Sequence, residues 1–515
     1  MKKAVVIAFS ILLAVAILGG IYFVFLNEGK ETNAASGEYW PDGAWRTSTP
    51  ETQGMDSAVL ADMVNAIEGS DIRVDSVTII RNGYLVCETY FYPYQKGLLH
   101  SMNSCTKSVI SAMTGMAIEE GDIHGVNDKI LDYYSDSNIA NVDSRKRDIT
   151  IRDMLTMTSG LDWEFINDES TSQMIQTEDW AKYTLDLPMR EQPGTSFTYS
   201  NGATQVMSDL LNKVTGKEVP DLFLEKFKRL GITDIYWSDN KGNTVNGFAG
   251  LFMHPDDMAK FGYLYLKKGS WSEEQLISEQ WVEESTRSYA EPGWTPLLPG
   301  YGYYWWITQC DGYTALGHGG NYICVIPEQE LVVVFTGGIY NNTDLFYPAE
   351  LVERYIIPSI KSDSPLENNN EASLLLQSAV DAAQGAPAVE AFMLPDTALH
   401  ISGRTYAISG LGTLTFHFQE GSNQFTFDLN SQLFTGGLNG VPCIIDAGDY
   451  GTLPDHNHIA VKGEWISEDT LQVQTQGLED GYVDVYDIEF EGDSIVVAIK
   501  SSLGFEQTLS GSYTG

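Results

Sequence analysis

The chain of 515 residues is too long for one ordinary domain, and its 43% hydrophobic content supplies the apolar side chains that folded cores need. This composition excludes an intrinsically disordered protein. The formal net charge of -40 at pH 7 argues against nucleic acid as a partner, because phosphate binding requires a basic surface.

An apolar segment without charged residues spans Ala4–Leu26. It is long enough to cross the roughly 30 Å hydrocarbon core of a bilayer as a helix. Lys2 and Lys3 precede it, so the positive-inside rule places the N-terminus in the cytoplasm. We therefore expect residues 1–36 to form a signal anchor with one transmembrane helix and a short linker, which leaves the rest of the chain extracytoplasmic in a single-pass membrane protein. Cleavage near Ala35 would instead give a secreted protein.

A helix and a β-hairpin are predicted next. Residues 58–67 show helical apolar spacing, and the strand-like runs 76–80 and 84–91 flank the dipeptide Asn82-Gly83. Asn-Gly between two such runs is the strongest short-range signal for a hairpin. We expect this hairpin to lead into a largely buried helix that starts at Ser104.

Ser104 and Lys107 lie in the first turn of that predicted helix. Residues three apart share a helix face, so the Lys107 amine can lie beside the Ser104 hydroxyl, and the positive end of the helix dipole favours negative charge there. This spacing makes Ser104 a candidate nucleophile with Lys107 as its base. A helix N-cap serine with an exposed lysine is the alternative, and a second Ser-x-x-Lys occurs in the polar, turn-like run Ser238–Lys241.

The middle of the chain reads as mostly helical. Helices are predicted over 149–160, 203–214 and 256–267, the first of them ended by Gly160. Strands are predicted to return at 301–308, 322–326 and 331–336. Strands near both ends of a helical region suggest one sheet to which both ends contribute.

Two further motifs contain residues suited to catalysis or substrate binding. Tyr199-Ser-Asn201 lies in a turn before the 203–214 helix, where a phenol can relay protons. His318-Gly319-Gly320 opens a strand, and its glycines allow a backbone or a substrate to approach closely. Each motif alone also fits an ordinary turn, and Tyr340-Asn-Asn342 matches the first pattern too.

In this order, Ser104-x-x-Lys107, Tyr199-x-Asn201 and His318-Gly-Gly resemble the serine β-lactamase and penicillin-binding-protein superfamily, in particular its class C-like branch of esterases and amide hydrolases. The resemblance covers about residues 40 to 360. For residues 37–362 it implies an α/β (α+β) β-lactamase-like domain, with an antiparallel sheet flanked by helices, a helical subdomain, and the site between them.

The resemblance also implies roles for the motif residues. Ser104 would attack a carbonyl, Lys107 would accept its proton, and Tyr199 would pass that proton to the leaving group. The oxyanion hole would consist of the backbone N–H groups of Ser104 and Asn321. The implied substrate-binding residues are Asn201, which would orient Lys107 or a substrate amide, and His318, Gly319 and Gly320.

One departure from the superfamily pattern bears on the substrate. Classical β-lactamases carry Lys-Thr-Gly where this chain has His318-Gly-Gly, and that lysine helps to hold the antibiotic carboxylate. A histidine with a pKa near 6.5 is mostly neutral at pH 7. The exchange favours esters, amides or small peptides over β-lactams. Residues Tyr303–Trp306 offer an aromatic surface for apolar acyl groups, or equally a sheet core.

The C-terminal region has a different character. Residues 363–395 are polar and read as a linker with a helical piece over 372–383. Short alternating segments within 396–515 predict a small all-β domain that looks like the lipocalin-like accessory domains of some relatives. The predicted strands are 412–417, 423–429, 458–462, 470–475, 483–490 and 493–499.

Neither a disulfide framework nor a metal site is predicted. The five cysteines, an odd number, are scattered, although Cys310 and Cys324 could be strand neighbours or buried thiols. His456 and His458 have no nearby cysteine or well-spaced carboxylates, which favours surface residues over metal ligands. We expect no metal and no organic cofactor.

The sequence thus predicts an extracytoplasmic serine hydrolase that cleaves an ester or amide bond of a small molecule or peptide through a Ser104 acyl-enzyme. A D-alanyl carboxypeptidase or β-lactamase that acts on cell-wall peptides or antibiotics is one alternative. A catalytically silent envelope sensor or scaffold is another.

Overall fold

The computed structural model describes residues 39–41, 43–165, 168–239, 245–388, 393–438, 440–448 and 458–515. Within it, Pro41–Gly515 form one unit. The predicted transmembrane segment Ala4–Leu26 lies outside the described residues, so the signal anchor stays a prediction. None of the helices in the described ranges is both long and apolar enough to cross a bilayer.

A seven-stranded antiparallel sheet forms the centre of the first domain. The early strands β1 and β2 pair with the late strand β12, which confirms that both ends of the region build one sheet. Every residue of β1 and β12 is buried, as expected for strands covered on both faces. The strand order is β2 (Tyr84–Tyr90), β1 (Val74–Arg81), β12 (Leu331–Gly337), β11 (Asn321–Ile326), β10 (Tyr313–Gly317), β9 (Trp306–Ile307) and β8 (Gly300–Tyr301).

The predicted hairpin at Asn82-Gly83 is confirmed. Both residues adopt positive φ values, 53° and 73°, in the turn between β1 and β2. A two-residue turn of this kind matches the right-handed twist of the flanking strands, and Asn-Gly reaches positive φ readily.

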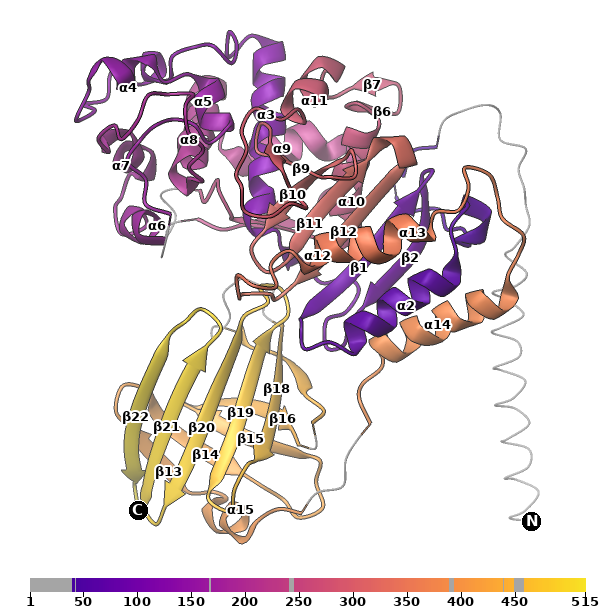
Figure 1. Cartoon of the computed structure of the whole chain (residues 1–515). Coiled ribbons are helices and arrows are strands. Elements are labelled where there is room, and N and C mark those ends of the chain that lie inside the picture. The colour runs from indigo at the N-terminus through magenta and orange to yellow at the C-terminus, as the bar shows by residue number, and fades with distance from the viewer. Residues whose placement is uncertain are drawn as a thin grey trace. The chain divides into compact units, whose positions relative to one another are not determined.

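Helices cover the sheet. Figure 1 shows α2 (Ser57–Glu68), α12 (Tyr347–Leu351), α13 (Ile357–Ser359) and α14 (Asn370–Gln384) on the side of the sheet that faces the viewer. α14, from the predicted linker, packs against α2 and β2. α10 (Pro255–Leu266) packs against β11 and β12, where a Cβ at Gly262 would lie 2.7 Å from Val332. The close approach therefore depends on this glycine.

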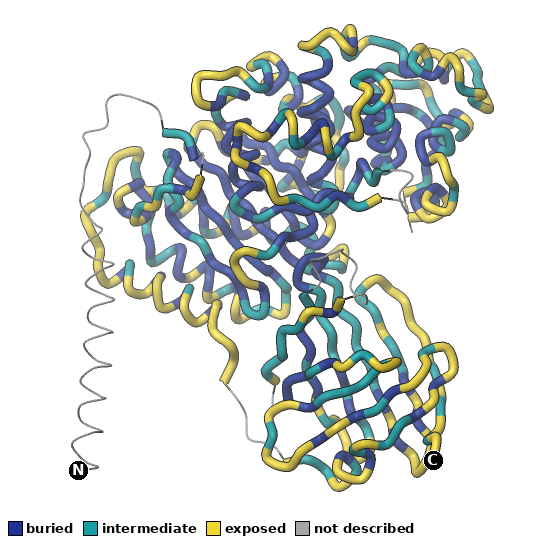
Figure 2. Tube along the Cα trace, turned by 180° about the vertical axis from the view of Figure 1, so that it is seen from behind, coloured by how far each residue is buried: buried dark blue, intermediate teal, exposed yellow. Residues whose placement is uncertain are grey.

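A helical subdomain surrounds α3 (Thr106–Glu120), whose residues from Thr106 to Ala117 are all buried. Figure 2 shows the buried segments of the chain concentrated in this region and in the sheet. The surrounding helices are α4 (Ser144–Asp148), α5 (Ile151–Leu155), α6 (Glu169–Met174), α7 (Trp180–Asp186), α8 (Asn201–Thr215), α9 (Val219–Phe227) and α11 (Glu279–Ser285). Two small sheets complete the domain: β3 (His100–Ser101), β5 (Leu251–Met253) and β4 (Ile235–Trp237), and β6 (Ser270–Trp271) with β7 (Glu274–Gln275).

The predicted helix over 149–160 is wrong in its second half. α5 ends at Leu155, and Met157 adopts a positive φ of 60°. The carbonyl of Met157 accepts a hydrogen bond from Thr198 N–H, and the carbonyl of Thr158 accepts one from Gly194 N–H, both at 2.8 Å. These bonds tie the segment to the loop that precedes Tyr199, so tertiary contacts replace the helical turn.

The predicted strand over 301–308 is broken into β8 and β9. Tyr304 has a positive φ of 62° in the turn between them. Gly302 N–H donates to the carbonyl of Trp305, and a Cβ at Gly302 would lie 2.2 Å from the carbonyl of Ser285. The turn is therefore set by a close backbone contact that the alternation of residues does not reveal.

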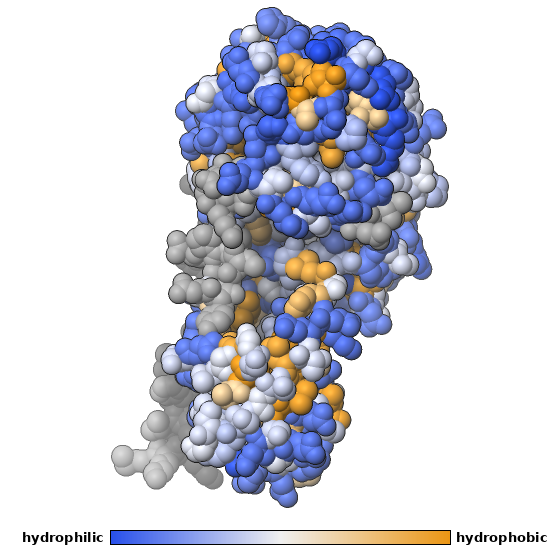
Figure 3. All heavy atoms as spheres, turned by 90° about the vertical axis from the view of Figure 1, so that its left-hand side faces the viewer, coloured by the Kyte–Doolittle hydropathy of each residue, from blue (hydrophilic) through white to orange (hydrophobic). Residues whose placement is uncertain are grey.

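The C-terminal residues form a closed β-barrel. Ten strands follow one another in hydrogen-bonded order, and a parallel pairing of Gly437 with Lys462 joins β16 to β18 and closes the barrel. Hydrophobic side chains gather on part of its surface, whereas hydrophilic residues cover most of the helical region in the same view (Figure 3). The short helix α15 (Asp396–Ile401) precedes β13 (Thr405–Ile408), β14 (Gly412–His417), β15 (Gln424–Leu429), β16 (Gln432–Gly437), β17 (Cys443–Asp446), β18 (His458–Trp465), β19 (Thr470–Gly477), β20 (Val483–Glu491), β21 (Ser494–Ser501) and β22 (Glu506–Tyr513).

Candidate active site

Ser104 and Lys107 form a hydrogen-bonded pair at the start of α3. Asn103–Cys105 make a single 3-10 turn that runs into the helix, so the two side chains lie on one face. Lys107 Nζ donates a hydrogen bond to Ser104 Oγ at 2.8 Å. The structure therefore brings the predicted nucleophile and base into direct contact.

The Lys107 amine is buried beneath Ser104, with 1% of the residue exposed. Its second hydrogen bond goes to the carbonyl of Phe248 at 2.9 Å, and the Tyr199 ring centroid lies 5.0 Å away. Burial lowers the pKa of Lys107 to about 7, because the surroundings disfavour the charged form. A substantial fraction of this amine is thus unprotonated at neutral pH and can accept the Ser104 proton.

Tyr199 is the third member of the cluster. It lies in the loop before α8, and the nearby Ser104 side chain lowers the pKa of its hydroxyl against the larger effect of burial. Burial raises the pKa of this phenol, so it stays protonated at neutral pH and can donate to a leaving group.

Of the two predicted roles of Asn201, the hydrogen bond to Lys107 is not formed in the structure, and the contact with a substrate amide stays a prediction. Its Nδ2 donates to Thr171 Oγ1 at 3.1 Å, while Lys107 takes the Phe248 carbonyl as its second partner. The Oδ1 atom of Asn201 is buried and accepts no hydrogen bond from the described residues. A buried acceptor without a partner is uncommon in folded proteins.

The His318-Gly319-Gly320 motif forms the tight turn between β10 and β11. Gly319 and Gly320 have φ values of 88° and 79°, a region that glycine adopts without steric penalty. Asn103 Nδ2 donates to the His318 carbonyl at 2.7 Å. A Cβ at Gly317 would lie 3.1 Å from the Ser104 nitrogen, so the end of β10 rests directly against the nucleophile turn.

Asn321 follows the turn and is fully buried. Its Nδ2 donates to the His318 carbonyl at 2.7 Å, and its Oδ1 accepts from Gly337 N–H at 3.3 Å. These bonds fix the backbone of the turn next to Ser104. The oxyanion role of the Ser104 and Asn321 N–H groups stays a prediction.

Two groups set the charge around the pair. His318 is a surface residue, and the protein atoms packed round its ring lower its pKa, an effect that the negative charge of Asp168 partly opposes. Cys105 and Asp168 also raise the pKa of Lys107, against the larger lowering effect of burial. The neighbourhood of Ser104 therefore holds a largely neutral histidine and a carboxylate, and sequence reasoning had not identified Asp168.

An aromatic cluster, also missed in part from the sequence, borders Tyr199. Phe165, Trp294 and Trp306 have ring centroids 5.1, 5.5 and 6.2 Å from that of Tyr199. Phe165 and Trp294 stack on each other at 5.3 Å and are 36% and 39% exposed. They lie in unrelated loops, so no local pattern joins them to the site.

The aromatic run 303–306 was predicted to be either substrate-binding surface or sheet core. In the structure, its residues differ in this respect. Trp306 stacks on Tyr199. Tyr303 packs on Trp281, and Trp305 packs on Tyr265, in the interior. Trp306 therefore borders the site, whereas Tyr303 and Trp305 belong to the core.

Of the other candidate residues, those that the structure describes have partners outside the Ser104–Lys107 pair. Cys105 is buried, its Sγ donates to the Asn321 carbonyl, and burial raises its pKa, so it remains a thiol. Cys310 and Cys324 are free thiols. Lys241 and His456 lie outside the described residues, while His458 Nδ1 contacts Glu479 Oε1 at 2.5 Å. The part of the chain that the structure describes contains no group of three potential metal ligands.

The sequence matches a family model described as Beta-lactamase over residues 60–337, which is more than half of the chain. No curated protein matches it. Among solved structures, a proposed 6-aminohexanoate-dimer hydrolase from Bacillus anthracis is 19% identical, with a TM-score of 0.50 over 62% of this chain and 89% of that one. An octameric penicillin-binding protein homologue from Pyrococcus abyssi is 15% identical, with a TM-score of 0.47 over 88% and 99% of the two chains. At 19% identity, the likeness to the first of these structures shows the fold alone.

Proposed function

Because the chain belongs to the Beta-lactamase family, we propose that it is a serine hydrolase that cleaves an ester or amide bond through an acyl-enzyme on Ser104. One observation carries this proposal. Lys107 Nζ lies 2.8 Å from Ser104 Oγ, and its pKa is lowered to about 7. A serine in contact with an amine of this kind is an activated nucleophile.

The proposed reaction proceeds in two halves. Ser104 Oγ attacks the substrate carbonyl while Lys107 takes its proton, and Tyr199 passes that proton to the leaving alcohol or amine as the carbonyl bond breaks. Water then attacks the acyl ester while Lys107 and Tyr199 serve as the base that removes its proton. This step releases the carboxylic acid and restores the Ser104 hydroxyl. Backbone N–H groups of Ser104 and Asn321 would stabilise the oxyanion, at about 3 kcal/mol per donor.

The charges and surfaces around Ser104 favour uncharged or apolar substrates. A lowered pKa keeps His318 largely neutral, and the nearby Asp168 repels an anion. A buried substrate carboxylate without a cationic partner would be destabilised by several kcal/mol. The exposed rings of Phe165 and Trp294 offer apolar surface instead. These features support neutral esters and amides over the carboxylate-bearing β-lactams.

The cellular location is part of the proposal. We place the hydrolase domain outside the cytoplasm on the basis of the apolar segment Ala4–Leu26 and the preceding lysines. Protease added to intact cells should remove the enzyme domain while a tag at Met1 stays protected. A mature N-terminus near Ser36 would show that the segment is cleaved.

A comparison of substrates tests the proposed activity. Short p-nitrophenyl esters should be hydrolysed with a kcat/KM well above that for penicillins at pH 7, and a fluorophosphonate should label the protein. Faster acylation by penicillins would replace this proposal with the carboxypeptidase or β-lactamase alternative. Absence of both turnover and labelling in folded protein would favour the silent sensor.

A further inference from the structure

The C-terminal barrel encloses a cavity of about 340 Å³. This volume falls within the range of small-molecule binding pockets, about 300 to 1,000 Å³. Part of the barrel interior is filled by a packed cluster that includes Tyr406, Phe490 and residues of α15, and some members of this cluster also line the cavity. The strands β19, β20 and β21 contribute the inward-facing residues at one end of the cavity, and β14, β15 and β16 contribute its apolar wall.

Most of the cavity wall is apolar. Phe427 and Phe434 stack with ring centroids 5.1 Å apart, and Leu414 and Val473 are almost completely buried beside the cavity. Leu503, which also lines it, is 60% exposed and marks a hydrophobic edge open to solvent. Such a wall favours an aliphatic or aromatic guest, because burial removes apolar surface from water.

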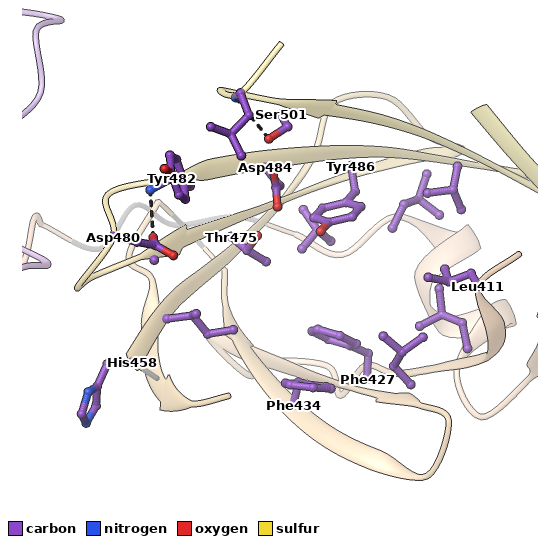
Figure 4. A pocket seen from close by; sticks show the side chains of 18 of the residues that line it. Leu411, Phe427, Phe434, His458, Thr475, Asp480, Tyr482, Asp484, Tyr486 and Ser501 are labelled. Carbon is purple, nitrogen blue, oxygen red and sulfur yellow. Dashed lines mark hydrogen bonds between the residues drawn. The ribbon is translucent and has the colours of Figure 1, made fainter. Parts of the chain in front are cut away.

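Polar groups gather at one end. Figure 4 shows Asp484, Thr475 and Tyr486 pointing into the barrel interior, whereas His458 turns away from it. The lining residues that the structure describes include three carboxylates and neither lysine nor arginine. One of the three, Glu479, contacts His458.

The carboxylates that line the cavity favour a cationic ligand over an anionic one. A fatty acid or other anion would bring its charge against these carboxylates, which is unfavourable in a partly buried site. Arg73, which donates to the Gly477 carbonyl at this end, is already paired with Asp75. An ammonium group would gain the attraction of Asp484 and a cation–π contact with Tyr486.

We propose that the barrel cavity binds an amphiphilic molecule with an aliphatic body and a protonated amine head, the head next to Asp484 and Tyr486 and the body between Phe427, Phe434 and Val473. The described lining residues all belong to the barrel, so binding there needs no chemistry at Ser104. The barrel thereby acts as a receptor for cationic amphiphiles attached to a hydrolase domain.

Calorimetric titration of the full chain with n-alkylamines tests the proposal. Affinity should rise about fourfold for each added methylene until the cavity is full. Octylamine should bind at least about tenfold more tightly than octanoate, and this preference should weaken as salt is added. Equal affinity for octanoate, or no binding of either, would overturn the proposal.

Matched variants locate the site. Thr475→Trp should fill the polar end and abolish amine binding, whereas Leu433→Trp, at a residue 63% exposed and outside the cavity lining, should not. Asp484→Asn should weaken the preference for octylamine over octanoate, while Glu489→Gln, an exposed carboxylate on the same strand that does not line the cavity, should keep it. Amine binding unchanged in both Thr475→Trp and Asp484→Asn would refute the assigned position.

Catalysis provides an independent readout. Ser104→Ala should bind octylamine as the wild type does, and Asp484→Asn should hydrolyse p-nitrophenyl esters at the wild-type rate. Amine binding by the barrel and ester hydrolysis at Ser104 are therefore tested independently. Loss of octylamine binding in folded Ser104→Ala would contradict a separate site and place the amine at the catalytic serine instead.

Discussion

Replacing Lys107 by methionine tests whether the buried amine loses its charge near neutral pH. The folded protein lowers the pKa of Lys107 from 10.5 to about 7 by burial. Between these values the unfolded chain binds more protons at this residue than the folded chain does. The free energy of unfolding therefore rises with pH in this window, and below about pH 7 the full destabilising effect is present.

The size of the effect follows from the lowered pKa. At 1.36 kcal/mol per pKa unit, the wild type should gain about 4 kcal/mol between about pH 6 and pH 10 from Lys107 alone. Lys107→Met removes this pH dependence but leaves the buried Phe248 carbonyl without its partner, which destabilises by about 1–3 kcal/mol at every pH. The variant should thus be more stable than wild type at pH 6 and less stable at pH 10.

Equilibrium unfolding in urea across this pH range, monitored for the hydrolase domain, measures the difference between the two proteins. Lys260→Met is the matched control, because Lys260 is also buried but has Asp257 as a partner at 2.8 Å. Removing it leaves an unpaired carboxylate and should destabilise at pH 6. A difference between wild type and Lys107→Met that does not change with pH would refute the inference that Lys107 becomes neutral near pH 7.

Three further predictions concern catalysis. In steady-state kinetics, Ser104→Ala should lower ester hydrolysis by at least about a thousandfold without unfolding the protein, while Ser238→Ala and Cys105→Ala should retain most activity. A loss of activity in Cys105→Ala as large as that in Ser104→Ala would assign the nucleophile role to the Cys105 thiol. Tyr199→Phe should lower kcat by about a hundredfold or more, most for substrates with poor leaving groups, since it removes the proposed proton donor; equal losses for good and poor leaving groups would argue against this role. His318→Lys should raise the kcat/KM for penicillins relative to esters, because it adds a permanent cation, and an unchanged ratio would show that this position does not select the substrate.

Local sequence patterns predicted the parts of the site that are themselves local. Ser104 and Lys107 are three residues apart on one helix, so their contact follows from helix geometry. The hairpin at Asn82-Gly83 follows equally from the φ preferences of two residues. In both cases the physical cause lies within a few residues of the chain.

Local sequence patterns do not encode contacts between segments that are distant in the chain. The Phe248 carbonyl that holds Lys107 lies 141 residues away in sequence, and backbone carbonyls carry no residue-specific signal. Likewise, the helix predicted over 149–160 stops early because Met157 and Thr158 bond to a loop some 40 residues later. Asp168 and Trp294 enter the site through loops, where periodicity gives no information.

In the barrel, too, strands with clear local alternation were predicted, whereas the remaining strands and the closure of the barrel were not. The alternating strands β14, β15 and β18–β21 were predicted near their observed bounds. β22 was missed because Glu506–Tyr513 is polar and mostly exposed, so it presents no clear apolar alternation. β13, β16 and β17 were missed as well, and β13 and β17 have only four residues each. Closure through Gly437 and Lys462 depends on pairing between separate hairpins, which no local pattern specifies.

Trapping the acyl-enzyme tests the central claim most directly. Wild-type protein mixed with a p-nitrophenyl ester, quenched in acid during turnover and examined by intact-mass and peptide mass spectrometry, should carry the acyl group on the Ser104 peptide, and Lys107→Met should carry none. An acyl group on another residue, or turnover with Ser104 unmodified in every quenched sample, would contradict the account.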